Sequence, residues 1–157
     1  MKIVIETFIA APREICFDLA RDVGAHVESA SFSRERVVPP GRMEGLLELG
    51  DQVSFEGVHF GRRQTITVKI IEMDPPRRFV DILVKSAFKS LRHDHDFESR
   101  DGGTLMRDTL EWVSPLGILG RIADALFVGR HMRHFVATKQ TALKRMAEDL
   151  TRRRGGA

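Results

Sequence analysis

The chain has 157 residues, a formal net charge of +3, 42% apolar and 30% charged residues, an ordinary composition for one water-soluble domain. No apolar run approaches the roughly 20 residues that cross a membrane, and the first apolar segment resembles a strand rather than a signal peptide. The single cysteine excludes an internal disulfide and is typical of a reducing compartment, so we expect a cytoplasmic protein.

The first half of the chain predicts strands and two short helices. Segments rich in β-branched and aromatic residues predict strands at 2–9, 46–49, 51–60, 62–73 and 78–85. After the first strand, Pro12 and the apolar spacing that follows it predict a short helix that ends or bends at Gly24. A second short helix is expected over 26–30. Proline-rich turns at 39–41 and 74–76 separate the strands, and strands joined by turns indicate an antiparallel sheet.

A β-hairpin at 91–113 is the most informative motif. Asp101-Gly102 lies between two alternating segments, and this dipeptide favours a two-residue turn. The turn sets four inward pairs opposite each other: Phe97 with Met106, His95 with Asp108, His93 with Leu110, and Leu91 with Trp112. On the other face it sets two opposite-charge pairs, Asp96 with Arg107 and Arg92 with Glu111.

The inward face of this hairpin is apolar except for His93, His95 and Asp108, which the register places together. A few polar groups inside an apolar wall are typical of a ligand pocket. The hairpin therefore predicts one wall of a binding site.

The last third of the chain predicts one long helix over 116–150, with Ser114 as its N-cap, Pro115 in its first turn and a bend at Gly129. The apolar residues that return to one side of it are Leu119, Ile122, Leu126, Val128, Met132, Phe135, Val136, Leu143, Met146 and Leu150. This helix is long enough to cover a curved sheet, and we expect a mostly apolar cavity between the two. The residues predicted to line that cavity are His93, His95, Phe97, Met106, Asp108, Leu110, Trp112, Met132 and Phe135.

Four motifs, together with this order of elements, resemble the START-like (SRPBCC) superfamily. They lie at 9–17, 72–79, 93–98, and at Asp108 followed by 115–117. They are most similar to the bacterial branch described as polyketide cyclase/dehydrase-like. The resemblance implies an α+β helix-grip fold, in which a curved antiparallel sheet of about seven strands wraps around a long C-terminal helix and two short helices follow strand one. This superfamily contains carriers, receptors and enzymes, so the resemblance implies no common catalytic set.

The polar cluster is compatible with several kinds of chemistry. His93 and His95 lie about 7 Å apart on one strand face and with Asp108 have the spacing of zinc ligands, but no third histidine accompanies them, so no metal is expected. Asp108 can also orient His95 as an acid–base pair. Alternatively, the cluster stiffens the hairpin or hydrogen-bonds a carboxylate or hydroxyl of a bound ligand.

We therefore expect binding of a small hydrophobic or amphipathic ligand, such as a lipid, a polyketide or an aromatic compound. The alternative is a cyclase or dehydratase that uses His95 and Asp108, and the pattern favours binding over catalysis. No cofactor is expected, and the sequence leaves the oligomeric state open.

One domain is expected over 1–151. The arginines at 152–154 predict a flexible basic tail over 152–157, and the basic group at 130–134 predicts a solvated helix face. Neither forms the long run or stripe of a nucleic-acid surface, so nucleic acid is not an expected partner.

Overall fold

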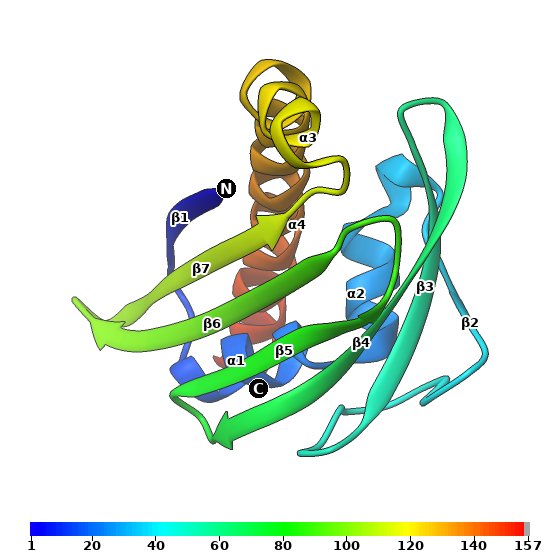
Figure 1. The fold of residues 1–157 in the computed structure, drawn as a ribbon. Helices are drawn as coiled ribbons and strands as arrows, with labels where there is room; N and C mark the ends of the chain where they lie inside the picture. Colours follow the sequence, from blue (N-terminus) through cyan, green and yellow to red (C-terminus); the bar gives the residue numbers. More distant parts are fainter. Residues whose placement is uncertain (156–157) are drawn as a thin grey trace.

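The computed structural model describes residues 1–155 and has the predicted α+β helix-grip architecture (Figure 1). The strands are β1 (Lys2–Ile9), β2 (Arg36–Val38), β3 (Gln52–His59), β4 (Arg62–Asp74), β5 (Arg78–Lys85), β6 (Ser90–Arg100) and β7 (Gly103–Val113). The helices are α1 (Arg13–Ala20), α2 (Val23–Ser29), the 3-10 turn η1 (Ser31–Ser33), α3 (Gly117–Ala123), the π-helical turn η2 (Asp124–Val128) and α4 (Gly129–Gly155).

One antiparallel sheet in the order β1-β7-β6-β5-β4-β3-β2 curls around α4 (Figure 1). The larger apolar core lies between the sheet, α1 and α4, and includes Phe17, Phe79 and Leu143. A smaller core surrounds Trp112 and includes Val136 of α4. Both cores hold the long helix against the concave face of the sheet, which is the arrangement that leaves room for a cavity.

The β6–β7 hairpin has the predicted register, so all four inward pairs lie opposite each other as expected. Asp101 and Gly102 both have positive φ, 48° and 75°, which is the backbone of a type I′ turn. The outward charges also lie opposite each other as predicted, but their ion pairs reach neighbouring strands instead. Arg78 of β5 contacts Asp96 at 2.6 Å, and Glu6 of β1 contacts Arg107 at 2.6 Å.

The predicted strand at 46–49 is wrong. Leu46 forms only an isolated bridge with Asp22, and the Leu47 N–H donates to the Arg21 carbonyl at 2.9 Å. This segment is therefore bound to the corner between α1 and α2 and does not extend the sheet. The short edge strand β2 was not predicted.

The C-terminal helix starts differently from the prediction. Leu116, in the left-handed conformation with φ 70°, precedes the first helical residue, and Ser114 is not the N-cap. Ser114 Oγ instead donates to Asp124 Oδ1 at 2.5 Å. The π-helical turn η2 lies just before Gly129, the position at which a bend was expected. A π turn adds a residue to the helical repeat and so changes the direction in which the preceding residues point.

This change of phase corrects one prediction about the helix. Leu119, Ile122 and Leu126 were expected on the side that covers the sheet, but all three are exposed. They belong to α3 and η2, which lie beyond the end of β7 (Figure 1). At this end of the molecule the helical segment has no sheet to cover.

The basic residues predicted as a flexible tail continue α4 instead. Arg152–Arg154 form part of its last turns, and the helix ends at Gly155. The remaining part of the predicted tail, 156–157, lies outside the described residues. Within residues 1–155, no helix is both long and apolar enough to cross a membrane.

Candidate functional site

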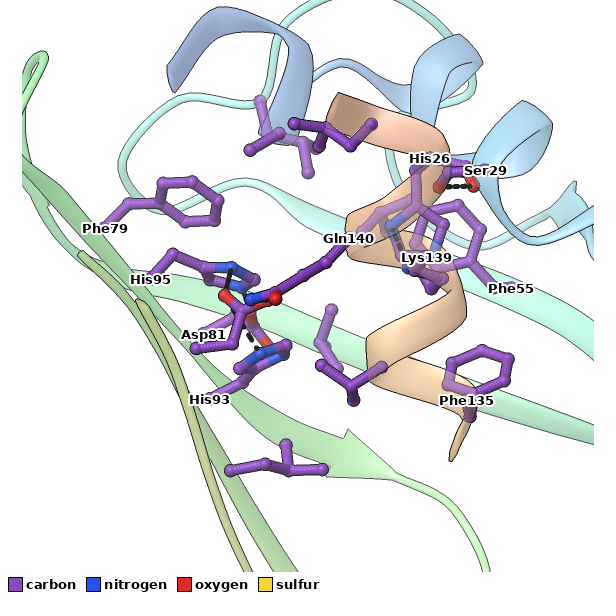
Figure 2. Close-up of a pocket in the computed structure, with 18 of the residues that line it drawn as sticks. His26, Ser29, Phe55, Phe79, Asp81, His93, His95, Phe135, Lys139 and Gln140 are labelled. Carbon is purple, nitrogen blue, oxygen red and sulfur yellow. Dashed lines mark hydrogen bonds and ion pairs between the residues drawn. The ribbon is translucent and has the colours of Figure 1, made fainter. Parts of the chain in front are cut away.

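A cavity of about 140 Å³ lies between the sheet and α4 (Figure 2). Strands β3 to β7 form one wall, α4 forms another, and α1 and α2 close it. Most of its lining is apolar and comes from Leu19, Ala20, Leu47, Val53, Phe55, Ile66, Val68, Ile70, Phe79, Leu91, Met106, Leu110, Met132, Phe135, Val136 and Leu143. Its position is the one predicted from the sequence.

Seven of the nine residues predicted to line the cavity do so: His93, His95, Met106, Asp108, Leu110, Met132 and Phe135. Phe97 and Trp112 do not, although both are buried. Phe97 packs edge-on against Phe17 of α1, with ring centroids 5.6 Å apart. Trp112 donates its indole N–H to Asp124 of η2 at 3.0 Å. Both side chains point inward as the hairpin pattern predicted, but each is held against a helical segment instead of the cavity.

Four ionisable side chains form the polar part of the strand wall, and we call them the Asp–His cluster: Asp81 of β5, His93 and His95 of β6, and Asp108 of β7. His95 is at its centre. Its Nε2 lies 3.1 Å from Asp81 Oδ2, and its Nδ1 lies 2.8 Å from Asp108 Oδ1. His93 Nε2 lies 3.5 Å from the same Asp108 oxygen. The predicted His95–Asp108 contact is thus present, and Asp81 is an addition to it.

Gln140 connects this cluster to α4 (Figure 2). Its side-chain amide donates to Asp108 Oδ2 at 2.8 Å, and its carbonyl oxygen accepts from Thr7 Oγ1 of β1 at 2.6 Å. Gln140 is fully buried. Asp108 is therefore fixed from the helix side as well as from the sheet.

His95 carries a proton at neutral pH because two carboxylates face its ring. Burial opposes this charge, but Asp108 and Asp81 outweigh burial and raise the pKa of His95 to about 9. Burial likewise opposes the charge on both carboxylates, yet the histidines lower the pKa of Asp81 and hold that of Asp108 far below its usual range. These three groups together therefore carry one net negative charge at neutral pH.

Several buried atoms of the cluster lack a hydrogen-bond partner among the described residues: His93 Nε2, His95 Nδ1 and Asp108 Oδ1. The 2.8 Å contact between His95 and Asp108 is therefore an ion pair without the alignment of a hydrogen bond. A buried polar atom without a partner costs about 1–3 kcal/mol. Here the three atoms face one another at 2.8 and 3.5 Å, so ion pairing within the cluster offsets part of that cost.

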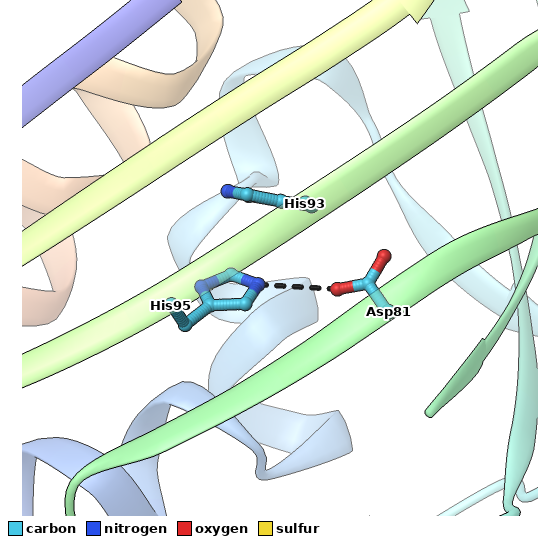
Figure 3. A group of neighbouring side chains, drawn as sticks. All are labelled: Asp81, His93 and His95. Atoms are coloured by element: carbon cyan, nitrogen blue, oxygen red, sulfur yellow. Dashed lines mark hydrogen bonds and ion pairs between the residues drawn. The ribbon is translucent and has the colours of Figure 1, made fainter. Parts of the chain in front are cut away.

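Asp81, His93 and His95 also place three donor atoms within 4.8 Å of one another (Figure 3). These are ligand types that zinc accepts, with Asp108 behind His95 as an orienting carboxylate. The sequence pointed to Asp108 as the third donor, whereas in the structure Asp81 has this place. A metal ion would have to replace the hydrogen bond between His95 and Asp81. The expectation that this protein holds no metal remains a prediction.

A second polar group, His26, Glu35 and Lys139, also lines the cavity, and Figure 2 shows His26 and Lys139 on the side away from the Asp–His cluster. Lys139 Nζ lies 2.8 Å from His26 Nε2, and that nitrogen lies 3.3 Å from Glu35 Oε2. The ring of His26 stacks on Phe55 with centroids 3.8 Å apart. Burial lowers the pKa of both His26 and Lys139, and Glu35 partly offsets this for Lys139.

The sequence analysis missed this second group together with Asp81 and Gln140. One signal was available for Gln140, because it shares a helical stripe with Val136, Leu143 and Ala147, all of them buried. A polar residue within a buried apolar stripe indicates a buried hydrogen bond. No comparable local signal marks Glu35 or His26.

No protein-family profile matches the sequence, and neither does any curated protein. Solved structures do match. TTHA0849 from Thermus thermophilus has a TM-score of 0.78 at 19% identity, over 96% of this chain and 99% of that one. The Zhui aromatase/cyclase from Streptomyces sp. R1128 has a TM-score of 0.71 at 16% identity, over 94% and 93%. Major latex-like protein 151 from Panax ginseng has a TM-score of 0.65 at 11% identity, over 94% and 97%.

The architecture and these likenesses define the fold. The chain has the START-like, helix-grip fold that its four motifs implied, and its mostly apolar cavity lies between the sheet and α4. At these identities the likeness concerns the fold, and the chemistry has to be argued from the site.

Proposed function

We propose that this protein binds a small, mostly apolar ligand that carries a hydrogen-bond donor. The observation that carries this proposal is the cavity itself, a mostly apolar space with the charged Asp–His cluster in its strand wall. The chemistry named for the aromatase/cyclase with this fold is also compatible with such a cavity.

The size of the cavity supports a compact ligand. At about 140 Å³ it is close to the roughly 150 Å³ of an engineered apolar cavity that accepts benzene. A single ring therefore fits without rearrangement. A lipid or a polyketide chain requires the walls to move, and the methionines at 106 and 132 are the most adaptable side chains in them.

The charge of the cluster favours a ligand whose polar end is a hydrogen-bond donor rather than a carboxylate. His95 with its two carboxylates has one net negative charge, which repels a ligand carboxylate. A hydroxyl or N–H can instead donate to a carboxylate of the cluster, since both Asp81 and Asp108 line the cavity. The carboxylate ligand considered from the sequence is therefore disfavoured at this end of the cavity.

Phenol and toluene test this proposal because they have nearly the same shape and differ in one hydroxyl. We expect phenol to bind at least tenfold more tightly than toluene, since a hydrogen bond to a charged group contributes about 1.5–3 kcal/mol. Titration calorimetry or ligand-observed NMR measures both affinities. Native mass spectrometry of protein purified from its own host tests for a retained natural ligand.

Two alanine variants provide the control. Ala20 lines the cavity, so Ala20→Leu fills part of it and should abolish binding of both compounds. Ala137 of α4 does not line the cavity, and Ala137→Leu should leave both affinities unchanged. Equal affinity for phenol and toluene would contradict the anchoring role of the cluster, and binding that survives in Ala20→Leu would contradict the location.

The alternative function is a cyclase or dehydratase in which His95 moves a proton. A pKa of about 9 makes His95 an acid rather than a base at neutral pH, and both of its ring nitrogens already face carboxylates. The geometry therefore favours an anchoring or stabilising role for His95.

His95→Ala distinguishes these roles. We expect lower thermal stability and a phenol affinity reduced by no more than roughly tenfold, the value of one hydrogen bond. Loss of water from a simple β-hydroxyketone is the matching enzymatic assay, and we expect no turnover that depends on His95. A fall in turnover of roughly 100- to 10,000-fold, with unchanged phenol affinity, is the signature of a general acid and would replace the binding proposal.

A further inference from the structure

The segment formed by α3 and η2 has an apolar face that nothing in the described chain covers. Its large side chains are between 51% and 78% exposed, and we call them the α3 apolar face: Leu116, Ile118, Leu119, Ile122, Leu126 and Phe127. Single exposed apolar residues are ordinary, but a contiguous group of this kind marks an interaction surface.

The spacing of four of these residues places them on one stripe. Positions 118, 119, 122 and 126 follow the i, i+1, i+4, i+8 pattern of a helix stripe about 100° wide. The segment is also fixed to the sheet. Asp124, fully buried beneath it, accepts hydrogen bonds from Trp112 at 3.0 Å and from Ser114 at 2.5 Å. The apolar face is therefore held outward by the fold.

The exposed charges of the segment that carries this face all have one sign. Between Glu111 and Glu148 the sequence contains a single acidic residue, Asp124, and it is buried. Arg121, within α3, and Arg130 and Arg133, in the first turns of α4, are exposed. None of these three arginines forms an ion pair with a described residue. An apolar stripe with a cationic border and no exposed carboxylate is complementary to an anionic, amphipathic surface.

We propose that the α3 apolar face docks on an anionic lipid surface. The helical segment is too short to span a bilayer, so it lies in the plane of the interface. Its apolar side chains enter the boundary between headgroups and acyl chains, and its arginines contact lipid phosphates. The proposal does not depend on the identity of the cavity ligand.

A second copy of this chain is a less suitable occupant. Self-association through a two-fold axis would bring the same face of both copies together and would place the arginines of one near those of the other. Like charges oppose such a contact, with no exposed carboxylate on the segment to compensate.

The position of this face gives docking a consequence for the cavity. Helix α4 continues directly from η2, and its Met132 and Phe135 line the cavity within the next two turns. Docking thus brings one end of the cavity lining close to the bilayer, where an apolar ligand partitions.

Vesicle flotation tests the proposal, with phosphatidylcholine vesicles that contain or lack phosphatidylglycerol. We expect the wild-type chain to float with the anionic vesicles and to be released by high salt. Leu119→Gln/Ile122→Gln should weaken this association at least tenfold. The matched control is Leu49→Gln/Val84→Gln, which changes two equally exposed apolar residues elsewhere and should bind like wild type.

Charge variants test the cationic border separately. Arg121→Gln/Arg130→Gln should weaken binding by about thirtyfold, because each cation beside an anionic membrane contributes about 1 kcal/mol. Arg62→Gln/Lys85→Gln removes the same charge from exposed positions elsewhere and should have a much smaller effect.

Three results would overturn the proposal. The first is a wild-type chain that stays unbound or floats equally with neutral vesicles. The second is a Leu119→Gln/Ile122→Gln variant that binds like wild type. The third is a sedimentation velocity result in which the wild-type chain is a dimer and the Leu119→Gln/Ile122→Gln variant is a monomer. Such a result would show that a second copy of the chain covers the face.

Discussion

The free energy of unfolding is expected to fall by about 3 kcal/mol as the pH rises from 6.5 to 9, through the deprotonation of His95. Burial disfavours the charged ring, but Asp108 and Asp81 outweigh it, so the folded state holds this proton more tightly than the unfolded state does. The stability gained from the charge is complete below the unfolded pKa of about 6.5. It is lost as the pH rises through the folded pKa of about 9.

The measurement is urea unfolding at a series of pH values, for wild type and for His95→Gln. Lys139 contributes with the opposite sign, since burial lowers its pKa and the folded state binds its proton less tightly. The informative quantity is therefore the difference in the free energy of unfolding between wild type and His95→Gln. This difference should shrink by about 3 kcal/mol between pH 6.5 and pH 9. His134→Gln, at an exposed position of α4, should keep the wild-type slope. A difference that stays constant with pH would show that the carboxylates do not hold His95 in its charged form.

The part of the site that could be predicted from the sequence is the part fixed by local structure. Asp101-Gly102 determines the turn, the turn determines the register, and the register places His95 opposite Asp108. Each step involves residues close in sequence, so no knowledge of the rest of the fold was needed.

Asp81 could not be predicted in the same way. Asp81 reaches His95 because the pairing of β5 and β6 places Asp81 opposite His93. No tight turn between the two strands sets this register. The connection between these strands lacks a turn signal of the Asp-Gly kind, and β4–β5 pairing contains two irregularities. Glu35 and Lys139 lie still farther apart in sequence. Contacts of this kind depend on how the sheet curls and on where α4 crosses it.

The segment 117–128 illustrates a different limit. Its apolar spacing is that of a helix with a buried side, and periodicity identifies the helix correctly. Periodicity does not identify what covers that side. In the structure the π turn changes the helical phase beyond the end of the sheet, so the covering surface has to come from outside the described chain, as the lipid proposal requires.

Asp108→Asn is expected to destabilise the protein by about 3–5 kcal/mol, the usual cost of removing one partner of a buried ion pair. The change keeps the shape of the side chain and leaves an oxygen for the Gln140 amide, so the loss reports charge rather than packing. His95 would keep only Asp81 as a counter-ion, and its pKa should fall toward the ordinary value. Urea unfolding near pH 6, where His95 is charged in the wild type, measures the effect.

Asp101→Asn is the matched control, because it removes a carboxylate from the exposed hairpin turn, where asparagine accepts positive φ equally well. The pair itself is tested by the double variant His95→Gln/Asp108→Asn. If the two residues stabilise the fold through their mutual attraction, the loss of unfolding free energy in the double variant is smaller than the sum of the losses in the two single variants. The expected shortfall is roughly 0.5–3 kcal/mol. Simple additivity would mean that each residue is held by its other neighbours, Asp81 and Gln140, and that the contact predicted from the hairpin register contributes no stability of its own.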